Sequence, residues 1–142
     1  MSYSELIQGY FERSVALQWY WTVFILVIGG VLGFSAFRQR PDLITTLLVM
    51  VLFAGFAYKN LGAIEATAEE RHAFLTAAKA VPDEGPGAAD VRRARTALDP
   101  VMPAYDIPAA RYFHIACSIL TVAFLGAAEW RRRQATDQPA AK

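Results

Sequence analysis

Three long apolar segments constrain this chain more than any other feature of its sequence. Residues 17–37 carry no charged side chain, and a helix of that length spans roughly 31 Å at 1.5 Å per residue, close to the thickness of a bilayer core. Residues 43–64 and 112–130 are also largely apolar, and each contains one charged side chain toward its end, Lys59 and Glu129. Three such segments in 142 residues, 55% of them hydrophobic, leave too little polar surface for a small soluble fold. The sequence therefore predicts an all-α integral membrane protein with three transmembrane helices.

Aromatic residues at the ends of these segments support that interpretation, because tryptophan and tyrosine gather at the two membrane–water interfaces. In an up-down-up path, one interface receives the start of the first span, the end of the second and the start of the third. The aromatic residues concerned are Trp19, Tyr20, Trp21, Tyr58 and Tyr112 at that interface and Trp130 at the other.

The distribution of arginines predicts the orientation in the membrane. The short 38–42 connector and the basic 131–142 tail fall on one side of three spans, and short basic elements favour the cytoplasm. We therefore expect a multi-pass protein of the bacterial inner membrane with its N-terminus outside and its C-terminus cytoplasmic. The start of the chain lacks a basic n-region, so no cleavable signal peptide is expected. The residues expected to set the topology and contact lipid headgroups are Arg38, Arg40, Arg131, Arg132 and Arg133.

The other polar parts predict a small extramembrane helical cap formed by extensions of the first two helices and the 82–111 connector. Residues 1–16 form an amphipathic lead-in with Ser4 as a candidate N-cap, and 65–111 form a helical connector. Helical stripes are expected at Leu6, Tyr10, Ser14 and Leu17, and at Leu61, Ile64, Ala68, Leu75 and Ala78.

Prolines and glycines divide the connector. A turn is expected at Pro82, Gly85, Pro86 and Gly87, followed by a short helix that ends before Pro100. Pro103 and Pro108 predict an extended or kinked return into the third span, and the 131–142 tail is expected to be disordered.

The stretch "EATAEERH" contains the candidate metal ligands Glu65, Glu69 and His72 at helical spacing. Glu69-x-x-His72 matches half of a carboxylate-bridged di-metal motif, but the second half is absent. A solvated or ion-paired face is the favoured alternative, and a cap ordered by pairing of these acids with Arg92, Arg93 or Arg95 is the next. We expect no cofactor, and a divalent metal remains the less favoured interpretation.

His114 is the other candidate ligand, inside the third apolar segment. An intramembrane titratable group suggests a proton relay, a metal ligand or a haem ligand. The favoured interpretation is a neutral imidazole bonded to a backbone carbonyl or to Asp106. Haem ligation by both histidines of one chain is not expected, since His72 lies beyond the membrane surface. The single cysteine, Cys117, is expected to be a core residue.

Small residues in the spans predict close helix packing, either inside the chain or with other chains. They are Gly29, Gly30, Gly33, Gly55, Ala123, Gly126 and Ala127.

These features favour a non-enzymatic membrane protein that self-assembles or serves as an accessory subunit of a larger membrane complex. A homo-oligomeric channel or transporter is the first alternative, and a metal- or haem-binding redox subunit is the second. The expected partners are membrane lipids and other membrane chains. A formal net charge of +1 gives no reason to expect nucleic acid.

Overall fold

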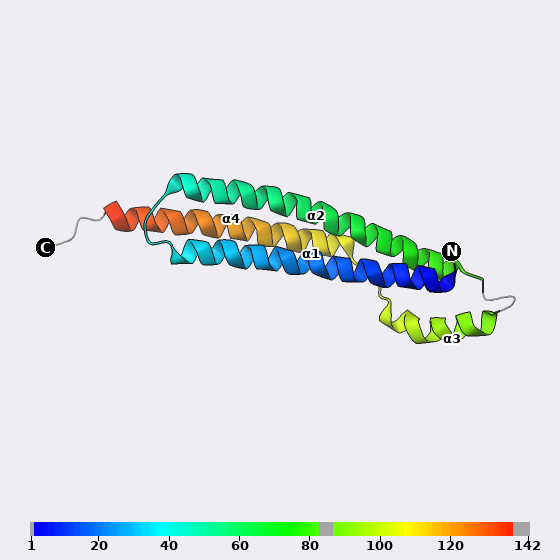
Figure 1. The fold of residues 1–142 in the computed structure, drawn as a ribbon. Helices are drawn as coiled ribbons and strands as arrows, with labels where there is room; N and C mark the ends of the chain where they lie inside the picture. The colour runs from blue at the N-terminus through cyan, green and yellow to red at the C-terminus, as the bar shows by residue number, and fades with distance from the viewer. Residues whose placement is uncertain (1, 83–86, 138–142) are drawn as a thin grey trace.

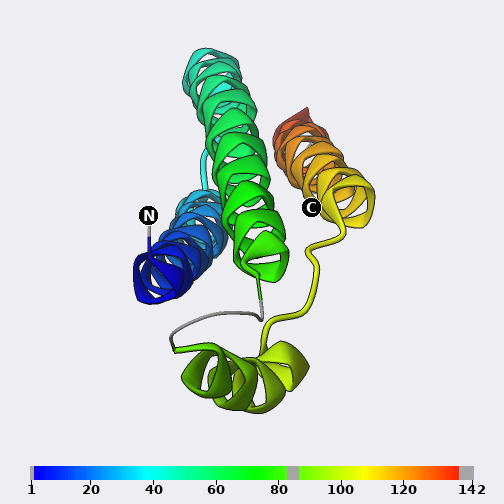
Figure 2. The same ribbon diagram turned by 90° about the vertical axis from the view of Figure 1, so that its right-hand side faces the viewer.

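The computed structural model describes residues 2–82 and 87–137, and every regular element within them is helical. The elements are α1 (Tyr3–Phe37), α2 (Leu43–Ala80), α3 (Ala88–Leu98), the 3₁₀ turn η1 (Asp99–Val101) and α4 (Ile107–Asp137). Figure 1 shows α1, α2 and α4 running alongside one another, with the short α3 near the end of the bundle that holds the N-terminus. Figure 2 shows the same three long helices from that end.

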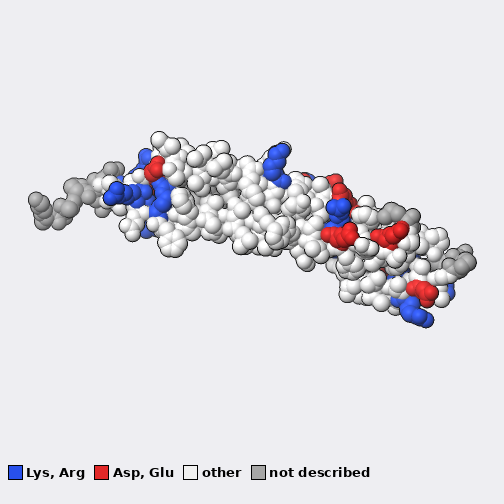
Figure 3. Space-filling view, in the orientation of Figure 1, with Lys and Arg blue, Asp and Glu red and all other residues white. Residues whose placement is uncertain are grey.

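Three helices are long and apolar enough to cross a membrane, which confirms that part of the predicted fold class. They are α1, α2 and α4, whose most apolar windows have mean hydropathies of 1.9, 1.8 and 1.5. In the face shown in Figure 3, charged side chains gather toward the two ends of the molecule, and a mostly uncharged belt separates them. This is the pattern of a multi-pass membrane protein.

Side-chain caps define where the long helices begin. Ser2, rather than the expected Ser4, is the N-cap of α1, because Ser2 and Glu5 form a reciprocal capping box. Asp42 caps α2 by accepting a hydrogen bond from the backbone amide of Thr45. Asp106 accepts from the amide of Ala109 in the first turn of α4.

Three apolar clusters follow one another along the bundle, and the predicted stripes supply much of them. Tyr10, Leu75 and Met102 form the cluster beside α3, where the extensions of α1 and α2 pack together. Leu17, Ile64 and Ala68 form the next. The third, deep in the apolar belt, consists of Phe24, Phe53 and Ala57.

The connector and the tail differ from their predictions at two places. The short helix α3 forms as expected, but α4 begins at Ile107, so Pro108 lies in its first turn, where a missing amide donor costs little. At the other end α4 continues to Asp137, so residues 131–137 are helical and not disordered. The predicted turn is described only at Pro82 and Gly87, since Gly85 and Pro86 lie outside the described residues; Gly87 has a φ of 89°, which favours glycine.

Candidate functional site

A buried carboxylate joins the three long helices at the arginine-rich end of the bundle. Glu129 of α4 is 3% exposed, and its Oε2 accepts hydrogen bonds from Thr46 Oγ1 of α2 and from an Arg132 nitrogen, each at 3.1 Å. The Arg38 guanidinium lies 3.9 Å from the same oxygen. Arg132 also donates to the backbone carbonyl and hydroxyl of Ser35 in α1. We call Ser35, Arg38, Thr46, Glu129 and Arg132 the Glu129 cluster.

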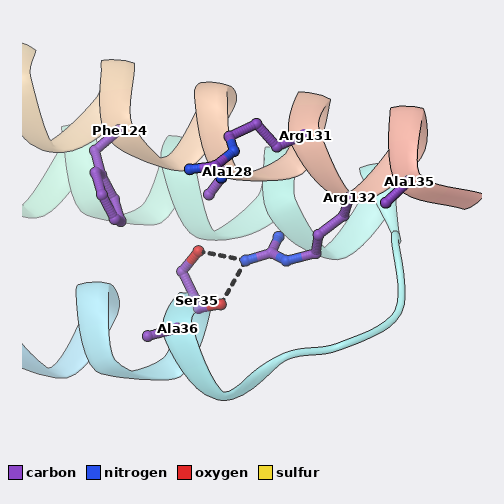
Figure 4. A pocket seen from close by; sticks show the side chains of 7 residues that line it. All are labelled: Ser35, Ala36, Phe124, Ala128, Arg131, Arg132 and Ala135. Carbon is purple, nitrogen blue, oxygen red and sulfur yellow. Dashed lines mark hydrogen bonds between the residues drawn. The ribbon is translucent and has the colours of Figure 1, made fainter.

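The three arginines around Glu129 outnumber the two carboxylates beside them, since Asp42 lies 4.0 Å from Arg38 and is the second acid. Arg38 and Arg132 both face Glu129, and Arg133 approaches its Oε1 to 3.4 Å from a position that is 45% exposed. Figure 4 shows Arg132 reaching from α4 to Ser35. The cluster thus fixes the helix ends and leaves an excess of positive charge there.

A second polar contact lies inside the bundle, near the opposite end of the apolar belt. Asn60 donates from Nδ2 to the backbone carbonyl of Tyr20 at 3.2 Å, and its Oδ1 lies 3.1 Å from His114 Nε2. Because the Asn60 amide nitrogen faces Tyr20, its oxygen faces His114. His114 must therefore carry a proton on Nε2 to donate a hydrogen bond to that oxygen. The imidazole is 1% exposed and stacks on the Phe24 ring, with centroids 3.8 Å apart. His114 therefore links α4 to α2 and α1, and its partner is Asn60, not Asp106 or a backbone carbonyl.

The predicted cap is held by polar contacts to the irregular segment between η1 and α4. Arg71 of α2 donates to the Tyr10 hydroxyl and to the carbonyl of Pro103, and Tyr10 donates to the same carbonyl. Trp21 donates from Nε1 to the Tyr105 hydroxyl at 2.9 Å. These bonds anchor residues 102–106 against α1 and α2.

Among the residues that the structure describes, one of the four candidate metal ligands is ion-paired, and the other three are not. Glu65 pairs with Arg111 of α4, and this contact raises the pKa of Arg111 above its ordinary value. Glu69 and His72 are exposed on α2, and His114 is buried with Asn60. Within residues 2–82 and 87–137, no group of three or more His, Cys, Asp or Glu side chains could hold a metal ion.

The arginines of α3 do not supply the salt bridge of Glu65, which comes from Arg111. Arg93 instead lies 3.9 Å from Asp90 on its own helix. Arg95 donates to the carbonyls of Ala78 and Val81, so it caps the C-terminal end of α2.

The glycines in the apolar parts of the long helices point away from the bundle. At about 100° per residue, Gly29, Gly30 and Gly33 lie on the side of α1 opposite the buried Leu17 and Phe24. A Cβ added at any of these three, or at Gly55 or Gly126, would meet no atom within 4 Å. Close packing within the chain occurs instead at Gly9, where a Cβ would lie 2.7 Å from the Phe74 ring. Ala123 and Ala127 are likewise exposed on α4.

Two apolar grooves flank α4. One, of about 660 Å³, lies against α2 and is lined by residues that include Phe53, Leu61, His114 and Ile119. The other lies against α1 and has two adjoining parts of about 520 Å³ and 350 Å³, which share Phe124. The second groove ends at Arg131 and Arg132, beside the Glu129 cluster.

Several site residues lay outside the candidates taken from the sequence. Glu129 precedes Arg132 and Arg133 by three and four residues, a spacing that pairs charges on one helix face. Asn60 lies inside the apolar 43–64 segment, where a polar side chain needs a partner, and that position could have marked it as a buried polar group. Ser35 and Thr46 carry no comparable signal, because small hydroxyl residues occur throughout membrane helices.

Comparisons with protein-family models, with curated proteins and with solved structures found no match to this chain.

Proposed function

We propose that this chain is a non-enzymatic subunit of the bacterial inner membrane that works by packing against other membrane helices. The orientation that we propose places the Glu129 cluster in the cytoplasm and α3 outside. The short, arginine-rich 38–42 and 131–133 segments support this orientation.

The outward glycine face of α1 is the observation that carries the proposal. Glycines at i and i+4 let two membrane helices approach closely, and here no atom of the chain's own bundle uses that approach at Gly29 or Gly33. Leu26 and Phe37, which flank the glycines on the same side, are 66% and 88% exposed. A helix that enters this face would contact bulky side chains on either side of a shallow glycine surface.

We favour a second copy of the chain as the simplest occupant of this face, with a helix of a larger complex as the accessory-subunit form of the same proposal. If the glycine face of α1 packs against the same face of a second copy, the two copies form a two-fold dimer in which both glycine faces are covered. The pairing would involve α1 alone and leave the Glu129 cluster intact.

Native mass spectrometry of the protein, gently extracted from its own membrane, tests this function. We expect a dimer or a defined complex, and a double Gly29→Leu, Gly33→Leu variant that dissociates to single chains. Gly55→Leu, the same change on an open face of α2, is the matched control and should leave the association intact. Single chains in the wild-type sample, or equal loss in both variants, would contradict packing through α1.

A further inference from the structure

We propose that the groove between α1 and α4 binds an anionic phospholipid, with the phosphate at Arg131 and Arg132 and one acyl chain along the apolar wall. This site borders the glycine face of α1, because Ala36 in its wall follows Gly29 by seven residues on the helix, and it differs from that face in its basic end.

The groove combines an apolar length with a basic end. Its apolar part is lined by Leu32 of α1 and by α4 residues that include Leu120, Phe124 and Ala127. The adjoining part continues past Phe124 to Arg131 and Arg132. Figure 4 shows Phe124 further along α4 from the two arginines, so the wall changes from apolar to basic along the helix axis. A phospholipid has the same sequence of groups, from acyl chain to phosphate.

The two arginines at the basic end of the groove, Arg131 and Arg132, differ in the contacts that they make within the chain. Arg132 is held by Glu129 and Ser35. Arg131 is exposed and makes no hydrogen bond or ion pair within the part of the chain that the structure describes. Arg131 is therefore free to turn toward a phosphate, while Arg132 stays fixed beside it.

Charge argues for a lipid rather than for a helix in this groove. Residues 38–42 and 129–137 contain five arginines and three acidic residues, so this end keeps a net positive charge. An apolar helix segment would bring no anion to balance it, whereas an anionic headgroup would. In the proposed orientation the site also faces the cytoplasmic leaflet, which carries a negative surface potential.

Lipid binding to the full chain, purified in a neutral detergent, tests the site by native mass spectrometry. The probes are dioleoyl phosphatidylglycerol and dioleoyl phosphatidylcholine, which differ only in the headgroup. We expect the anionic lipid to bind at least about fivefold more tightly. Equal affinity for the two lipids would overturn the proposal.

Matched variants distinguish the groove from general charge attraction. Arg131→Gln should weaken phosphatidylglycerol binding about fivefold, while Arg40→Gln, which removes an equal charge from the exposed connector, should change it less than twofold. Ala127→Trp should weaken the binding of both lipids because it fills the apolar wall. Equal effects of Arg131→Gln and Arg40→Gln, or no effect of Ala127→Trp, would overturn the site.

Two further experiments identify what occupies the groove. Millimolar inorganic phosphate should not displace phosphatidylglycerol, because it lacks the acyl chain; displacement by phosphate would show a simple anion site and overturn the lipid assignment. A groove covered by a helix of a second copy would bind neither lipid in the dimer, and that result would also overturn it.

Discussion

Glu129 is the residue whose loss should most weaken the bundle, and Glu129→Gln tests this with little change in shape. The amide can still accept a hydrogen bond from Thr46, so the variant removes the charge and leaves the packing almost intact. Arg132, whose side chain is 14% exposed, then loses its only acidic partner among the described residues, whereas Arg38, which is 18% exposed, keeps Asp42 at 4.0 Å.

The size of the effect follows from the burial of these groups. Removing one partner of a buried ion pair costs about 3–5 kcal/mol because the other charge stays uncompensated. Arg133 is nearly half exposed and can turn to solvent, and Arg38 is 3.9 Å away, so part of that cost is relieved. We expect Glu129→Gln to lower the free energy of unfolding by about 2–3 kcal/mol.

Reversible unfolding by dodecyl sulfate in mixed micelles, followed by tryptophan fluorescence, measures this free energy. A double-mutant cycle with Arg132→Gln should give a coupling of about 1–2 kcal/mol between the two residues. A loss below about 0.5 kcal/mol for Glu129→Gln, the range of ordinary surface changes, together with no coupling, would refute the reasoning.

Three further predictions concern the core, the buried amide and a helix cap. Phe24→Ala should cost about 3–5 kcal/mol in the same assay because Phe24 is 1% exposed, whereas Phe34→Ala, at a 46% exposed position, should cost far less. Asn60→Leu should cost about 1–2 kcal/mol by leaving the buried His114 Nε2–H without its acceptor, and no loss would show that the amide is dispensable. Hydrogen bonds from Thr45 lower the pKa of Asp42, so its stabilisation is present above its unfolded pKa and lost as pH falls through the lower folded value. Asp42→Asn keeps the cap acceptor and should reduce the loss of thermal stability as pH falls below about 4, and an unchanged pH profile would contradict that role.

The helices could be predicted because each depends on a local pattern. The spans follow from uninterrupted apolar length, and the stripe containing Leu6 and Tyr10 follows from helical spacing. Ser2 could also have been found, since Ser2-x-x-Glu5 is the capping-box pattern. Residues 131–137 were predicted to be disordered because their composition is basic and polar. The signal for a helix was the spacing of three and four residues at which Arg132 and Arg133 pair with Glu129.

The polar contacts could not be predicted to the same degree because they join residues far apart in sequence. Arg132 and Ser35 are separated by 97 positions, and their contact depends on the register between α1 and α4. His114 and Asn60 are 54 positions apart and meet for the same reason. The outward direction of Gly29 and Gly33 likewise depends on which side of α1 faces the bundle, and glycine itself gives no information on that choice.

The membrane topology proposed here requires α2 to cross the membrane, and cysteine accessibility on either side of α2 tests that crossing most directly. In a Cys117→Ala background, single cysteines replace Ala97 in α3 and Gln39 in the arginine-rich connector, both exposed positions. An impermeant thiol reagent should label Ala97→Cys in intact cells and Gln39→Cys only after the membrane is opened. Labelling of both positions in intact cells, or protection of both, would place the two ends on one side and contradict that crossing, and labelling of Gln39→Cys alone would invert the proposed orientation.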